Sequence, residues 1–158
     1  TLRELEGLID IYLPDMKYSN ESLAAKLSCA PDYVETAKAA IQEMYRQVGS
    51  AAIEDDIMQR GLIVRHLMLP GELDNTLGVL DWFAETFPKG DVLFSLMSQY
   101  VPMGKAKKLP PYNRKITEEE YDAAISYLEF LGIESGFTQD FTSATEDYIP
   151  DFSFEGLE

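Results

Sequence analysis

The chain has one cysteine and one histidine among its 158 residues. A single thiol, Cys29, excludes internal disulfides and every metal or iron–sulfur site that needs two cysteines of this chain. No Ser/His/Asp or Cys/His arrangement can be assembled around His66, which we expect to pack beneath a helix. The sequence therefore shows neither a catalytic triad or dyad nor a set of metal ligands.

Long apolar runs and basic residues are also scarce. Arg65 and His66 interrupt the strongest apolar run, so no stretch approaches the ~18 residues of a membrane span. Thirteen basic residues against 28 acidic ones give a net charge of −15, which disfavours nucleic acid as a ligand. With 46% apolar residues, the chain is expected to form one folded domain, without nucleic-acid or membrane partners. Its single cysteine favours a reducing compartment, the cytoplasm.

Segments with the character of strands and of helices alternate along the chain. The predicted strands are 8–13, 62–69, 92–99 and 134–139, and the predicted helices are 20–28, 31–48, 73–87 and 117–131. Pro31 is expected to begin the second helix, and Thr117 with Glu120 to form a capping box. This order predicts parallel strands joined by helices. We assign residues 1–141 to one domain and 142–158 to an acidic, aromatic tail.

Polar residues at the ends of the predicted strands are the candidate site. Asp15 and Lys17 point the same way in extended backbone and could bind a zwitterion, although from these two residues alone a surface ion pair in a turn is the favoured interpretation. Arg65 lies within an apolar strand, where a guanidinium needs a partner, so we expect it to face Asp15, Asp10 or a ligand carboxylate. Gln99 and Tyr100 end the third strand with hydrogen-bonding groups. No metal ligands are predicted.

Three segments carry a family resemblance. DIYLPDMKY, IVRHLMLPGELDNTLGVLDW and SLMSQYVPM resemble the C-terminal half of radical S-adenosylmethionine (SAM) proteins of the pyruvate formate-lyase activating enzyme type. Each motif is weak alone, but the order and the intervals agree over nearly the whole chain. The resemblance implies an α/β fold that is half of a partial (β/α)6 TIM-like barrel with parallel strands.

The resemblance also implies a chemistry and a set of binding residues. Members cleave SAM reductively at a [4Fe–4S] cluster, and the resulting radical abstracts hydrogen, in the activating enzymes from a glycine of a partner enzyme. Asp15 and Lys17 match the strand end beside the methionine part of SAM, and Arg65 matches an arginine inside the barrel. Leu69 matches an apolar residue near the adenosine, and Tyr100, or Gln99 if the register slips, replaces a histidine.

This chain lacks the cysteine motif with which proteins of that family bind the cluster. We therefore expect the chain to be part of a longer oxidoreductase, in which a missing N-terminal half holds the cluster, and to bind neither cofactor tightly alone. A glycyl radical enzyme and an electron donor are the expected partners. The alternative is a non-catalytic acidic module that binds a protein through residues 100–115 or the tail.

Overall fold

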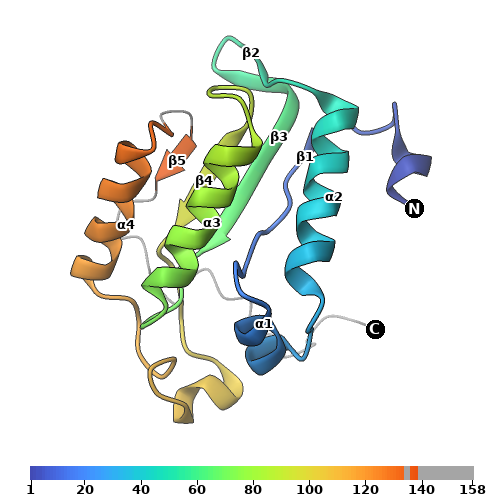
Figure 1. Cartoon of the computed structure of the whole chain (residues 1–158). Coiled ribbons are helices and arrows are strands. Elements are labelled where there is room, and N and C mark those ends of the chain that lie inside the picture. Colours follow the sequence, from blue (N-terminus) through green and yellow to red (C-terminus); the bar gives the residue numbers. More distant parts are fainter. Residues whose placement is uncertain (134–135, 139–158) are drawn as a thin grey trace, which may run out of the picture.

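The computed structural model describes residues 1–133 and 136–138 (Figure 1). The helices are η1 (Leu2–Leu5), α1 (Glu21–Ser28), α2 (Tyr33–Val48), α3 (Leu73–Thr86), η2 (Gly104–Lys108) and α4 (Glu118–Phe130). The strands are β1 (Ile11–Tyr12), β2 (Ala52–Glu54), β3 (Ile57–Leu67), β4 (Leu93–Met97) and β5 (Gly136–Thr138). The predicted tail, 142–158, lies outside the described residues.

The strands form an open, mixed sheet, so the prediction of half of a parallel-stranded (β/α)6 barrel is wrong. The order is β1-β3-β4-β5 with parallel neighbours, and β2 pairs antiparallel with β3. Residues 52–61, for which the sequence predicted no strand, form a hairpin of β2 and the first half of β3. Asp55 and Asp56 make its turn with φ of 50° and 62°, the left-handed conformation that tight hairpins need.

Helix ends follow the sequence closely, with one exception. Asn20 caps α1 by accepting from the backbone N–H groups of Ser22 and Leu23 at 2.8 and 3.2 Å. The capping box of Thr117 and Glu120 is confirmed at the start of α4. Pro31 does not begin α2, which starts at Tyr33.

The helices pack on one face of the sheet, and this sets the character of both faces. Along β3 the even-numbered residues from Leu62 are buried, whereas Ile63, Arg65 and Leu67 are partly exposed. Figure 1 shows α2, α3 and α4 on the same side of the sheet. The core lies between this side and the helices, and its largest fully buried side chains include Met16, Ile41, Leu62, Met68, Leu80, Phe94 and Leu96. Arg65 therefore belongs to the face opposite the helices.

Candidate functional site

The candidate site begins with an ion pair at the carboxyl end of β1 and β3. Residue 15 pairs with residue 65 in a parallel bridge, in which Met16 N–H donates to the Arg65 carbonyl at 2.8 Å and Arg65 N–H to the Pro14 carbonyl at 2.9 Å. Arg65 Nη2 then lies 2.8 Å from Asp15 Oδ1. Of the two carboxylates of the chain that the sequence offered to Arg65, Asp15 and Asp10, the structure selects Asp15, because the register of β1 on β3 places it alongside.

The backbone pairing of β1 with β3 places the two side chains together, and the ion pair itself adds little to the stability of the fold. The side chains of Arg65 and Asp15 are 40% and 34% exposed, and an ion pair with such solvent access contributes about 1 kcal/mol or less. Asp15 Oδ1 is enclosed, and its contact is the Arg65 guanidinium at 2.8 Å. Arg65 Nε is also enclosed and donates no hydrogen bond to a described residue, so the guanidinium keeps one unused donor.

Lys17 is held at its backbone and exposed at its side chain. Its N–H donates to the Tyr33 hydroxyl at 2.9 Å, and its carbonyl accepts from Asn75 Nδ2 at 3.0 Å. The Tyr33 hydroxyl in turn donates to the Asp15 carbonyl at 3.0 Å. Because Met16 between them is fully buried, Asp15 and Lys17 are the more exposed residues of this segment.

His66 holds the same segment from beneath and is not a catalytic base. Its Nδ1 donates to the Met16 carbonyl at 2.7 Å, so its Nε2 accepts from the Thr76 hydroxyl of α3 at 3.0 Å. Complete burial lowers the pKa of His66 from 6.5 to about 4. The imidazole is therefore neutral at pH 7, and the prediction of a histidine packed beneath a helix is confirmed.

At the third strand end, Tyr100 and Gln99 differ in exposure and in hydrogen bonding. The Tyr100 hydroxyl donates to the Tyr112 carbonyl at 2.8 Å and is engaged in the loop that follows β4. Gln99 is exposed, and its side chain forms no hydrogen bond within the described part of the chain. Leu69 lies just beyond β3, partly buried. Leu69 and Gln99 each lie two residues beyond the last pair of β3 and β4, Leu67 with Met97.

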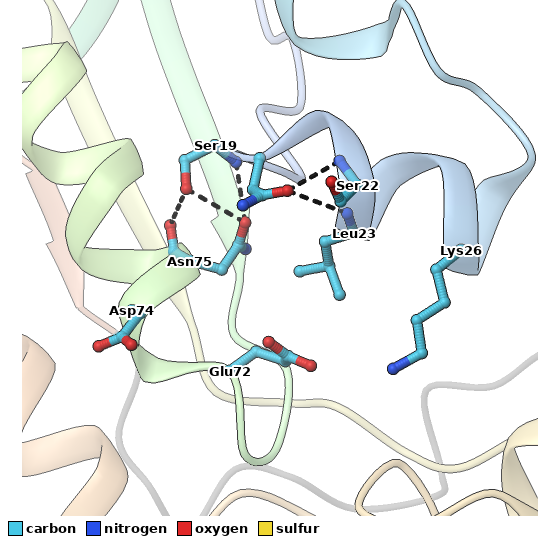
Figure 2. Close-up of a pocket in the computed structure, with 8 residues that line it drawn as sticks. Ser19, Ser22, Leu23, Lys26, Glu72, Asp74 and Asn75 are labelled. Carbon is cyan, nitrogen blue, oxygen red and sulfur yellow. Dashed lines mark hydrogen bonds between the residues drawn. The ribbon is translucent and has the colours of Figure 1, made fainter.

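A pocket that no sequence pattern predicted opens beside this edge of the sheet, between α1 and the first turn of α3 (Figure 2). It has a volume of about 410 Å³, and its walls include Ser19, Ser22, Leu23, Lys26, Glu72 and Asn75. Helices that follow parallel strands begin at the same edge of a sheet. The strong N-cap residue Asn20 and the Pro-Gly-Glu segment after β3 were the signals that could have located it.

One buried residue, Asn75, joins the pocket wall to the predicted site. It is 4% exposed, its Oδ1 accepts from the Ser19 N–H at 2.8 Å, and its Nδ2 donates to the Lys17 carbonyl at 3.0 Å. The Ser19 hydroxyl donates to the Asn75 carbonyl at 3.0 Å. These hydrogen bonds fix the whole segment after β1 against the start of α3.

No group of three or more His, Cys, Asp or Glu side chains in residues 1–133 and 136–138 is arranged to hold a metal ion. Within the same residues, no helix is long and apolar enough to cross a membrane.

The fold and the site define an α/β protein with an open mixed sheet and a polar edge where parallel strands end. The chain is 31% identical over 131 residues to an uncharacterized protein of Methanocaldococcus jannaschii. The match covers 82% of this chain and 34% of that protein, so the chain spans about a third of this relative's length. No family model and no solved structure matches the chain.

Proposed function

We propose that this chain is the SAM-binding part of a longer radical SAM oxidoreductase that activates a glycyl radical enzyme in the cytoplasm. The supporting observation is the ion pair of Asp15 and Arg65 on the sheet face away from the helices. The residues that carry the resemblance lie at the ends of β1, β3 and β4. These three strands are adjacent in the sheet, with β3 between the other two. The relative's greater length leaves room for a cluster-binding segment in a protein of this kind.

The charges of this edge fit SAM. The methionine part of SAM carries an ammonium and a carboxylate, which suit the Asp15 carboxylate and the cations of Lys17 and Arg65. Gln99 would hydrogen-bond the ribose, Leu69 would contact the adenosine, and Tyr100 would hold the loop behind Gln99. These residues bind and orient the cofactor.

A [4Fe–4S] cluster does not fit this chain. Iron–sulfur clusters require several thiolates, and the single cysteine, Cys29, is exposed at the end of α1. We therefore assign no step of the reaction to a described residue beyond binding SAM. The cluster, and an electron donor for it, belong to the proposal only through the rest of the longer protein.

The test uses the natural gene product, purified without oxygen and reconstituted with iron and sulfide. We expect a polypeptide longer than this chain that takes up about four irons, as a [4Fe–4S] cluster requires, and binds SAM in a calorimetric titration. Arg65→Gln should weaken SAM binding about ten- to hundredfold, the value of one hydrogen bond to a charged group. Arg46→Gln is the matched control, because Arg46 also pairs with carboxylates, Glu6 and Glu43, at the far end of α2.

Two outcomes would overturn the proposal. One is a gene product of 17.8 kDa that takes up no iron. The other is SAM binding that Arg65→Gln and Arg46→Gln leave equally unchanged. The first outcome would favour the acidic protein-binding module, in which Asp15 and Arg65 form only a structural ion pair.

A further inference from the structure

The pocket between α1 and α3 contains an ammonium and a carboxylate that are held apart. Lys26 Nζ lies 3.4 Å from the Tyr112 hydroxyl and 5.4 Å from the centre of its ring, and the Tyr112 hydroxyl donates to Glu72 Oε1. Burial and the hydrogen bond to Glu72 raise the pKa of Tyr112, so its hydroxyl keeps its proton. Neither Lys26 nor Glu72 forms an ion pair with a described residue. Tyr112 therefore acts as a neutral spacer between two opposite charges.

Three other polar side chains of the pocket are already committed to the fold. Asn75 and Ser19 bond to each other, and the Asn20 side chain caps α1. Leu23 supplies a buried apolar wall. Figure 2 shows the side chains of Lys26 and Glu72 pointing toward one another, with Leu23 beside the space between them. Between Lys26 and Glu72 a ligand therefore meets one cation, one anion and an apolar surface on a rigid frame, whereas Figure 2 shows the side chain of Asp74, which also lines the pocket, turned away from Lys26.

We propose that this pocket binds a free α-amino acid as its zwitterion. The ligand's carboxylate would pair with Lys26, its ammonium with Glu72, and its side chain would lie against Leu23. A pocket of about 410 Å³ is of the size that binds small molecules. A phosphate or nucleotide fits less well, because Glu72 and the nearby Asp74 outnumber the one lysine of the pocket lining.

This site is separate from the proposed SAM site and does not depend on it. Lys26 and Glu72 belong to the helix layer, whereas Asp15 and Arg65 lie on the face of the sheet away from the helices. Asn75 and Lys17 connect the two regions through the backbone, without sharing a ligand-facing charge. Variants at the two sites can therefore separate the two proposals.

The experiment follows backbone amide signals of the full chain by NMR while the twenty standard L-amino acids are added in small pools. We expect shifts at the amides of Ser22, Leu23 and Asn75 for at least one amino acid. For that amino acid, we expect its carboxamide and its deaminated acid to bind at least tenfold more weakly, because each lacks one of the two charges.

Two variants test the assignment of the charges. Lys26→Met keeps the stem over Tyr112 but removes the ammonium, and Glu72→Gln removes the carboxylate charge; each should weaken binding at least tenfold. Lys38→Met is the matched control, because Lys38 also lies over an aromatic ring, 5.7 Å from the centre of Trp82, but does not line the pocket. Unchanged amide dispersion in each variant shows that it folds.

Several results would overturn the inference. No amide shift with any pool would do so, as would equal binding of the carboxamide, or binding that Lys26→Met and Lys38→Met affect alike. Amino-acid binding that Arg65→Gln abolishes and Lys26→Met leaves intact would move the ligand to the strand-end site. Loss of SAM binding in the Arg65 variant has no bearing on these outcomes.

Discussion

The buried histidine should make the stability of this protein depend on pH well above the range in which carboxylates titrate. His66 has a pKa of about 4 when folded, against 6.5 for an exposed imidazole. On acidification the unfolded chain therefore binds a proton before the folded one does. Stability is complete above pH 6.5 and falls as the pH decreases toward 4. Proton linkage gives a loss of about 2 kcal/mol between pH 7 and pH 5, and about 3 kcal/mol over the whole interval.

Urea unfolding at pH 7, 6 and 5 measures this loss directly. The sequence makes the test clean, because His66 is its only histidine. Glu43 and Glu120, whose pKa values are lowered to about 2 chiefly by hydrogen bonds from Arg46 and Arg114, contribute only near and below the ordinary carboxyl value of 4.5. His66→Asn removes the titrating group, so the free energy of unfolding of this variant should change little between pH 7 and pH 5.

Equal pH dependence in the two proteins would refute this reasoning. It would mean that the imidazole is not buried as a neutral group between Met16 and Thr76. A wild-type stability that does not change from pH 7 to pH 5 would have the same meaning.

Three substitutions test the frame of the site by urea unfolding. Asn75→Ala removes the hydrogen bonds to Ser19 and Lys17 and should cost about 2–3 kcal/mol; a loss below the error of the measurement would contradict that network. Gly78→Ala should destabilise despite the better helix propensity of alanine, since the new Cβ would lie 2.6 Å from Ser19 Oγ, and Ser19→Gly in the same chain should relieve the loss. Thr117→Ala should cost about 1 kcal/mol through the lost cap of α4, and no change would show that the capping box adds nothing.

The sequence predicted best those elements whose positions depend on neighbouring residues. The apolar run after residue 61 located the second half of β3, and the capping residue Thr117 located α4, because strand burial and helix caps depend on neighbouring residues. The hairpin turn at Asp55 and Asp56 carries a weaker signal than Asn-Gly, and β2 was missed together with the mixed character of the sheet.

The candidate site was partly predictable for a similar reason. The unusual position of Arg65 in an apolar strand showed that it needed an anion, but only the register of β1 against β3 selected Asp15. The pocket depends on contacts between residues far apart in sequence, such as Lys26 with Tyr112, and no periodicity predicts those. The bond from the Tyr100 hydroxyl to the Tyr112 carbonyl was equally hidden, because it forms within a long loop.

The shortness of β1 has a consequence for how the molecule opens. Only Ile11 and Tyr12 form its ladder with β3, and the bridge at Asp15 extends the pairing by one further point. Segments with few paired residues exchange their amide hydrogens through local opening at low free energy, long before the whole domain unfolds. We therefore expect β1, which leads into Asp15 and Lys17, to exchange its amide hydrogens faster than the longer strand β3. Any molecule that binds only the paired form will slow this exchange in proportion to its occupancy, so amide exchange at β1 reports binding even of a ligand whose chemistry is unknown.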